Sequence, residues 1–327
     1  MREGAGKMKK YDVVALGELL IDFTVNGTSP QGNPVYEANP GGAPCNVLSM
    51  LTKLGRKTAF IGKVGQDIFG IRLRTVLEEA GIDTSCLVAD DTARTTLAFV
   101  ETFPDGDRDF SFYRNPGADM MLTEEEVDVA MLKDTEIFHF GTLSMTHEGV
   151  RNATKKAVAA AKEAGAVISF DPNLREPLWN SLKEAGEQTA YGLSQCDFLK
   201  ISDNEIRWFT GVEDFDAGIS KLRSRYDIPL IVLSMGKEGS RAYYKDIRVE
   251  AAPFLQERTI ETTGAGDTFG GCCLHYVRQY GLHNMNRERL TDMLVFANAA
   301  ASVITTRKGA LRVMPGEDEI RELIGKF

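Results

Sequence analysis

The run TTGAGDTFGG places a carboxylate beside a candidate anion-binding turn. Gly264, Ala265 and Gly266 precede Asp267 at the start of a predicted helix that continues to Tyr280. Small residues allow main-chain N–H groups to converge on an anion at the positive end of a helix. A carboxylate beside a bound phosphate suits one task, which is taking a proton from an attacking hydroxyl group. The run therefore indicates a phosphoryl-transfer site, although Asp267 could instead simply cap the helix.

A second segment, GGAPCN, has the composition of a binding turn for a small polar ligand. Gly41 and Gly42 precede a predicted apolar helix over residues 43–54. Two glycines before a helix allow close approach of the backbone to a ligand. Asn46 adds both a donor and an acceptor for hydroxyl groups.

These segments must be positioned by a larger scaffold, and the chain predicts one. From Tyr11 onward, short β-branched runs alternate with helical stretches. This alternation predicts an α/β fold with a mostly parallel central sheet and helices on both faces. Ligands of such sheets bind beyond the carboxyl ends of the strands. Several polar residues and a glycine follow predicted strands at those ends: Asp22, Asp171, Ser202, Ser234 and Gly236.

Two stretches, residues 21–40 and 95–115, break the alternation. The second has alternating side chains around a predicted turn at residues 104–107, which is typical of a hairpin. Its aromatic residues exceed what a solvated edge should expose, so they require a cover. These aromatic residues are Phe99, Phe103, Phe110 and Phe112. We therefore predict a small β-sheet lid made of the two stretches.

Composition restricts the class of protein. The formal net charge is −9 and the basic residues do not cluster, which argues against nucleic acid as a partner. No apolar run is long enough to cross a bilayer, so no membrane contact is expected. The five cysteines show no paired spacing, which argues against disulfides or a zinc site and favours the cytoplasm. We expect residues 1–10 to form a disordered tail and residues 11–327 to form one domain.

The motifs together resemble the ribokinase-type (PfkB) carbohydrate kinases. GGAPCN with GKVGQDIFG is similar to the first signature of this family, and TTGAGDTF to the second. Further blocks resemble the fructokinases within it: GELLIDF, ARTTLAFV, FYRNPGADM, DPNLREPLW and TTRKGAL. The resemblance extends from Gly17 to Leu311. It implies a ribokinase-like fold with a β-sheet lid, a homodimer formed through that lid, and ATP and Mg²⁺ as cofactors.

The resemblance also implies the reaction and its residues. The γ-phosphoryl group of ATP would pass to a primary hydroxyl of fructose, with Asp267 as general base and Gly264, Ala265 and Gly266 as the anion hole. The sugar-binding positions would be Asp22, Gly41, Gly42, Asn46, Phe112, Arg114 and Arg175. Judged without the family, each of the two arginines could equally form a surface salt bridge.

The resemblance places the nucleotide at a further set of residues. They are Lys200, Ser202, Ser234, Gly236, Gly239 and Asn298. Glu205 would be a second-shell magnesium carboxylate. Where the family usually has an Asp that helps to hold a monovalent cation, this chain has Glu261. The extra methylene displaces the carboxylate by about 1.5 Å, which argues against potassium activation.

Other functions remain open at this level. A noncatalytic sugar or nucleotide sensor could retain the fold, although the intact Asp267 and its turn argue against one. A dehydrogenase and a P-loop NTPase both lack their motifs here. Within the family, the alternatives are 2-keto-3-deoxygluconate kinase, ribokinase and aminoimidazole riboside kinase. Binding the carboxylate of the keto acid requires positively charged side chains, which Arg114 and Arg175 could supply.

Overall fold

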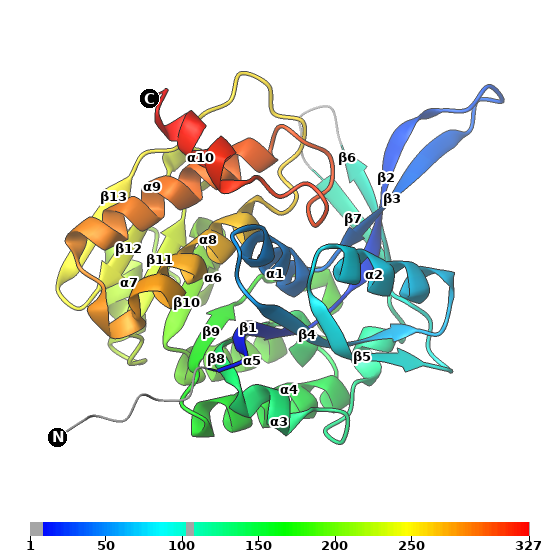
Figure 1. Cartoon of the computed structure of the whole chain (residues 1–327), viewed down its shortest axis with the longest axis horizontal. Helices are drawn as coiled ribbons and strands as arrows, with labels where there is room; N and C mark the ends of the chain where they lie inside the picture. The colour runs from blue at the N-terminus through cyan, green and yellow to red at the C-terminus, as the bar shows by residue number, and fades with distance from the viewer. Residues whose placement is uncertain (1–8, 103–107, 327) are drawn as a thin grey trace.

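A nine-stranded sheet forms the centre of the molecule (Figure 1). This is a computed structural model that describes residues 9–102 and 108–326. The strand order is β13 (Ile247–Ala251), β12 (Ser240–Tyr244), β11 (Leu230–Ser234), β10 (Phe198–Ser202), β9 (Val167–Asp171), β8 (Thr135–Gly141), β1 (Tyr11–Leu16), β4 (Thr58–Gly65) and β5 (Asp83–Asp90). All neighbours pair in parallel except β11 with β12 and β12 with β13. The predicted α/β fold with a mostly parallel sheet is confirmed.

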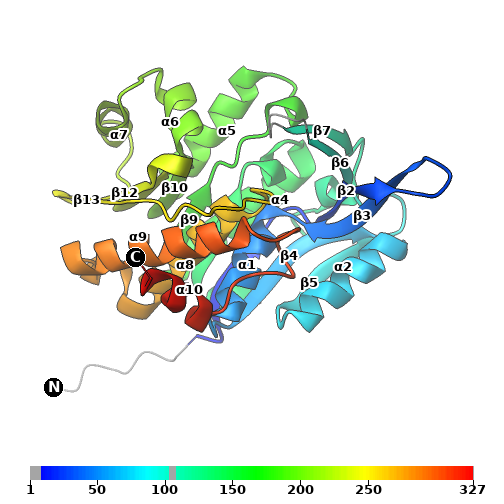
Figure 2. The same cartoon turned by 90° about the horizontal axis from the view of Figure 1, so that it is seen from above.

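Helices cover both faces of this sheet (Figure 2). Alternate residues of β1 point to opposite faces, so that Val13 belongs to one apolar cluster and Val14 to the other. One face carries α1 (Ala43–Lys53), α2 (Ile68–Glu79), α8 (Ala265–Tyr280), α9 (Arg287–Ile304) and α10 (Glu317–Ile324). The other carries α3 (Val129–Lys133), α4 (Glu148–Glu163), α5 (Leu182–Gln195), α6 (Asp203–Thr210) and α7 (Phe215–Arg223). Because both faces are covered, the inner strands are largely apolar, and the buried Lys63, His139 and Lys200 are exceptions.

Short 3₁₀ helices lie in the loops between these elements. They are η1 (Ala118–Met121), η2 (Leu143–Met145), η3 (Glu176–Leu178), η4 (Gly236–Glu238) and η5 (Leu282–Asn284). Among the described residues, none of the helices combines the length and apolar character that a bilayer span requires.

The strand order reverses between β1 and β8. From β1 the chain proceeds to β4 and β5 on one side, and then returns to β8, β9, β10 and β11 on the other. In open α/β sheets, ligands bind in the crevice outside the carboxyl ends of strands at such a switch point. Asp171, Ser202 and Ser234 end three of these strands, as the sequence predicts.

A second, four-stranded sheet lies beside the carboxyl ends of the central strands (Figure 1). Its strand order is β3 (Pro34–Gly41), β2 (Leu20–Thr28), β6 (Leu97–Thr102) and β7 (Arg108–Tyr113). β6 and β7 pair antiparallel, as the hairpin prediction requires. The predicted turn at residues 104–107 and Phe103 lie outside the described residues. This sheet is the predicted lid.

Aromatic side chains of the lid pack against one another. The ring of Phe99 stacks on that of Phe23 at 4.9 Å and meets the rings of Tyr36 and Tyr113 edge-on. Tyr36 and Tyr113 are nevertheless exposed, at 44% and 66%. Mutual packing therefore covers only part of the aromatic surface of the lid.

The amino-terminal tail is largely outside the description. Residues 1–8 of the predicted tail are not among the described residues. Lys9 is described, and its ammonium group donates to the carbonyl oxygens of Thr135 and Ala164.

Candidate active site

The two motif segments meet at the start of α8. Asn46 of α1 donates a hydrogen bond of 2.8 Å from Nδ2 to Oδ2 of Asp267. The two helices approach closely at Gly271, where the absence of a side chain leaves room for Met50 of α1. A Cβ atom on Gly271 would lie only 2.9 Å from Cβ of Met50. Figure 1 shows α1 and α8 side by side. Close packing of two helices thus brings together residues that are 221 positions apart.

Asp267 has the electrostatic character of a base. Its side chain is half-buried in the first turn of α8. Burial raises the pKa of this carboxyl, while the hydrogen bond from Asn46 and the charges of Lys200 and Arg175 act in the opposite direction. A carboxylate with a raised pKa accepts a proton more readily than an ordinary surface Asp.

The turn before Asp267 accepts only small residues. Gly264 is the N-cap residue of α8 and has a left-handed backbone with φ of 75°. A Cβ atom there would lie 2.5 Å from Cβ of Ala310. A Cβ atom on Gly266 would lie 3.3 Å from Nζ of Lys200. The buried ammonium group of Lys200 therefore lies against the predicted anion hole.

Two of the three predicted anion-hole N–H groups, those of Ala265 and Gly266, differ in their hydrogen bonding. The N–H of Ala265 donates to the carbonyl oxygen of Thr262 at 3.2 Å. Within the described part of the chain, the N–H of Gly266 has no hydrogen-bonding partner. Unbonded N–H groups in a first helical turn are the donors that an anion can use.

Lys200 is held by a carboxylate from the neighbouring strand. The parallel register of β9 and β10 pairs Ser169 with Phe198 and Phe170 with Leu199, so Asp171 and Lys200 follow side by side. Nζ of Lys200 lies 3.0 Å from Oδ2 of Asp171. Burial raises the pKa of Asp171 to about 7, although Lys200 opposes this. The sequence places Asp171 at a strand end but gives no sign of this ion pair.

Glu205 is tied into the backbone around it. It forms a capping box with Ser202, whose N–H and hydroxyl group donate to Oε2 at 2.8 and 2.7 Å. Oε1 accepts from the N–H of Leu174 at 2.8 Å. Although burial opposes it, Lys200 and these hydrogen bonds lower the pKa of Glu205, so its carboxylate is ionised. Both oxygens are used internally, which fits a metal held through water better than a direct ligand.

A pocket of about 310 Å³ joins this side of the site. Four of the predicted site residues line it, namely Arg175, Lys200, Ser202 and Glu205. Arg175 is exposed, and its Nη1 donates to the carbonyl oxygen of Leu174. No group of three or more His, Cys, Asp or Glu side chains suited to a metal ion occurs among the described residues.

The predicted sugar-binding turn leaves no room for side chains. A Cβ atom on Gly41 would lie 2.3 Å from Oδ2 of Asp22. Gly42 has φ of 123°, and a Cβ atom there would lie 2.4 Å from the carbonyl oxygen of Glu18. The backbone therefore requires a glycine at position 42, and Gly41 brings the main chain against the carboxylate of Asp22.

Arg114 is engaged within the protein rather than at its surface. Its guanidinium is buried and lies 2.7 Å from the carboxylate of Asp119. It also donates to Oγ1 of Thr146 and to the carbonyl oxygen of Leu143, at 2.9 and 3.0 Å. Each of its nitrogens thus has an internal partner. Phe112, from β7, is half-buried.

Two of the predicted nucleotide residues, Gly239 and Asn298, meet at the end of β13. Gly236 and Gly239 flank η4, both with positive φ, and a Cβ atom on Gly239 would lie 2.2 Å from the carbonyl oxygen of Ala251. Asn298 of α9 donates to that same oxygen at 3.2 Å and to the carbonyl oxygen of Ala252 at 3.0 Å. The amide group of Asn298 therefore fixes the chain at this end of the sheet. Ser234 ends β11, which is separated from β13 by β12.

Glu261 contacts the loop that follows α9. Its Oε1 accepts a hydrogen bond of 2.8 Å from the N–H of Gly309. Gly309 precedes Ala310, which packs on Gly264. The side chain of Glu261 thus links the irregular segment before α8 to this loop.

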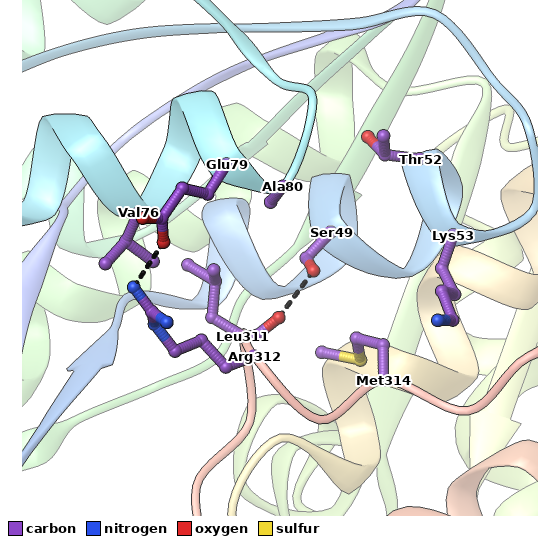
Figure 3. A pocket seen from close by; sticks show the side chains of 9 residues that line it. All are labelled: Ser49, Thr52, Lys53, Val76, Glu79, Ala80, Leu311, Arg312 and Met314. Atoms are coloured by element: carbon purple, nitrogen blue, oxygen red, sulfur yellow. Dashed lines mark hydrogen bonds and ion pairs between the residues drawn. The ribbon is translucent and has the colours of Figure 1, made fainter.

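A separate pocket of about 420 Å³ lies beside α1 (Figure 3). It is lined by residues of α1 and α2 and by Ala80, Leu311, Arg312 and Met314, and it contains none of the predicted site residues. Within it, the hydroxyl group of Ser49 donates to the carbonyl oxygen of Leu311 at 2.6 Å, and Arg312 pairs with Glu79. The Ser49 bond fixes the loop that holds Ala310 against the turn of Gly264.

The fold and this arrangement define a carbohydrate kinase. Residues 10–316 match the pfkB family of carbohydrate kinases, so the chain belongs to that family. Fructokinase-1 of Zea mays is 40% identical over 96% of this chain and 98% of its own length.

Solved structures agree with this assignment. A fructokinase of Xylella fastidiosa with bound ATP superposes with a TM-score of 0.87, at 31% identity over 97% of this chain and 99% of that one. A fructokinase of Vibrio cholerae O395, solved with fructose, ADP and potassium, has a TM-score of 0.86. It is 27% identical, over 97% of this chain and 100% of that one.

Proposed function

We propose that this protein is an ATP-dependent fructokinase that converts fructose to fructose 6-phosphate. One observation carries the proposal. Asn46 uses Nδ2 to bind Asp267, while its buried Oδ1 has no hydrogen-bonding partner among the described residues. An unpartnered buried acceptor costs about 1–3 kcal/mol, and a sugar hydroxyl beside Asp267 would satisfy it.

The chemistry follows from the groups around that hydroxyl. Asp267 would take the proton of the primary hydroxyl as the hydroxyl oxygen forms a bond to the γ-phosphorus of ATP. The bond from that phosphorus to the β,γ-bridging oxygen would break at the same time, and ADP would leave. In this proposal, negative charge on the transferred group would accumulate beside the unbonded N–H of Gly266 and the ammonium of Lys200, which lie next to each other. Preorganised donors of this kind stabilise the transition state because they need no reorientation.

The remaining predicted residues take supporting roles in this proposal. Asp22 and the Gly41–Gly42 backbone would bind further sugar hydroxyls from below, and Phe112 would cover the sugar from the lid. ATP would lie along the ends of β10 and β11, against Ser202, Ser234, Gly236 and Gly239. Mg²⁺ would neutralise charge between the phosphates, with Glu205 reaching it through water. Asn298 would support the adenine end.

Relatives support fructose as the substrate. The maize and Xylella proteins are named fructokinases, and the Vibrio structure contains fructose itself. A keto-acid substrate would require cations for its carboxylate. Of the two arginines considered for it, Arg114 is bonded to Asp119 inside the protein, which leaves Arg175.

We also propose a homodimer that forms through the lid. Val25, Val35, Tyr36 and Tyr113 are exposed on this small sheet, and a second copy would cover them. Sedimentation of the wild type and of Tyr113→Arg tests this proposal. We expect a dimer that the arginine weakens, and a monomeric wild type would contradict it.

An ATP-coupled activity screen tests the substrate. Fructose, 2-keto-3-deoxygluconate, ribose and fructose 6-phosphate are compared at equal concentrations, with Asp267→Asn as the inactive control. We expect the highest kcat/KM for fructose. A higher value for another substrate would reassign the enzyme within its family, and absence of turnover on all four would contradict the kinase proposal.

A further inference from the structure

Glu18 is a buried carboxyl at the topological switch point. It lies in the turn between β1 and β2 and is 4% exposed. In the part of the chain that the structure describes, no cation forms an ion pair with it. A buried carboxylate without a paired cation is costly, so its contacts indicate what it does.

Glu18 caps α1 from outside the helix. Its Oε1 accepts a hydrogen bond of 2.8 Å from the N–H of Ala43, the first residue of α1. The N-cap residue itself is Gly42, which has no side chain to make this bond. The carbonyl oxygen of Glu18 also lies directly under Gly42, where a Cβ atom would approach to 2.4 Å. Side chain and backbone of Glu18 thus both define the turn.

That turn carries the sugar side of the proposed site. Gly41 and Gly42 lie in it, and Asn46 follows one helical turn later, bonded to Asp267. On its other side, Glu18 faces a cavity of about 10 Å³ that it shares with other polar residues. This volume accommodates about one water molecule and no sugar. Glu18 therefore acts on the site from beneath and does not touch the substrate.

Several charged or titratable groups face this carboxyl. They are the buried ion pair of Arg114 with Asp119, the thiol of Cys45 on α1, His139 on β8 and Asp171 on β9. Burial raises the pKa of Glu18 to about 7, with Asp119 adding to the rise and Arg114 opposing it. Burial lowers the pKa of His139 to about 3, so His139 stays neutral. Glu18 therefore gains or loses its charge near neutral pH.

We propose that Glu18 is a positioning residue whose ionised carboxylate, by capping α1 at Ala43, holds the Gly41–Gly42 turn and Asn46 in the arrangement that binds the sugar. The inference rests on the proposed function, since it concerns the same site. A carboxylate accepts an N–H bond about twice as strongly as a neutral group does. Protonation of Glu18 thus weakens sugar binding without changing the groups that perform the transfer.

The experiment compares KM for fructose and kcat from pH 6 to pH 8.5. If the sugar binds only when Glu18 is ionised, one proton is linked to binding. In the wild type, KM should then rise about tenfold from pH 8 to pH 6. In Glu18→Gln, which keeps an acceptor for Ala43 but cannot ionise, KM should be independent of pH. Glu18→Ala should raise KM at every pH and change kcat by less than about threefold. Glu136→Gln, at the amino end of β8 and near Arg278, is the control and should behave as the wild type.

Thermal unfolding supplies a readout that does not depend on activity. Because the folded pKa of Glu18 is raised above the unfolded value, the wild type loses stability as pH rises from about 4.5 to about 7. Glu18→Gln should therefore have a higher Tm than the wild type at pH 8 and an equal Tm at pH 4.

The outcomes separate this inference from the proposed function. Identical pH dependence of KM in the wild type and Glu18→Gln would overturn it, as would a loss confined to kcat in Glu18→Ala. A wild type that does not phosphorylate fructose would contradict only the proposed function. The pH profiles of KM and kcat would then be measured with the sugar that the enzyme does phosphorylate. The outcomes named above would decide whether Glu18 positions the sugar-binding turn.

Discussion

Asn46 and Asp267 are joined by a hydrogen bond of 2.8 Å although they are 221 positions apart. The amide of Asn46 donates to the carboxylate with one end and presents an unpartnered, buried oxygen with the other. The bond holds the carboxylate in one orientation and lowers its pKa against the effect of burial. A hydroxyl group placed between the two residues would meet an acceptor and a base together.

Asp267→Asn should retain sugar and ATP binding while losing most turnover. An amide keeps the size of the side chain but cannot take a proton, and loss of a general base typically costs a factor of about 10²–10⁴ in kcat. Steady-state kinetics and calorimetric titration with fructose measure the two effects. A kcat within a few-fold of the wild type would exclude Asp267 as the base.

Asp22 and the two arginines should separate the candidate substrates. With fructose, Asp22→Ala should cost about 2–4 kcal/mol in kcat/KM, more than Arg175→Ala, because a neutral sugar depends on hydrogen bonds. With 2-keto-3-deoxygluconate the order should reverse. Indifference of fructose turnover to Asp22 would contradict the fructokinase proposal.

Arg114→Ala is expected to act differently from Arg175→Ala. It leaves the carboxylate of Asp119 buried without its partner, and breaking a buried pair typically costs about 3–5 kcal/mol of stability. The main effect should therefore be a lower free energy of unfolding in urea, with either substrate. A fully stable Arg114→Ala that loses only keto-acid turnover would instead assign Arg114 to the substrate.

Lys200 should matter for catalysis as well as for folding, and Lys63 provides a matched control. Both lysines are 7% exposed and each is paired with an Asp, Lys200 with Asp171 and Lys63 with Asp90, while Lys63 also pairs with Glu126. Lys200→Met and Lys63→Met should both lower stability. Only Lys200→Met should reduce kcat, by about 10²–10³, the usual effect of removing one donor to the developing charge.

The same pair of variants predicts a change in pH dependence. Asp267 must be ionised to act, so kcat/KM falls as pH decreases through its raised pKa. Lys200 lowers that pKa, so Lys200→Met should move the acid limb to higher pH, while Lys63→Met leaves it in place. If the acid limb of kcat/KM lay at the same pH in both variants, Lys200 would not act on the pKa of Asp267.

Potassium should have little effect on the wild type. The carboxylate of Glu261 is bonded to the N–H of Gly309, and its longer side chain would disturb a compact coordination shell. Activity in potassium chloride and in choline chloride at equal ionic strength should agree within about twofold, a change too small to represent a bound cation. Glu261→Asp should introduce activation by potassium. Strong activation of the wild type would contradict the expectation drawn from Glu261.

Local sequence patterns determined the architecture and the positions of the strand-end residues. Alternating β-branched runs and amphipathic helices specify buried parallel strands, and glycines before helices specify turns that approach a ligand. Asp267, Asn46 and the Gly41–Gly42 turn could therefore be predicted as candidate site residues from segments that are local in the chain.

Only the tertiary structure decided how distant groups pair. The sequence predicts Arg114 as a sugar-binding residue next to the lid. In the structure its guanidinium instead bonds to Asp119, Thr146 and Leu143. Glu18 is an ordinary acidic residue in the sequence, and its bond to Ala43 exists because β1 and α1 meet at the switch point. Periodicity reports which face of an element is buried, but burial, partner and pKa depend on the elements packed against it, and these come from remote parts of the chain.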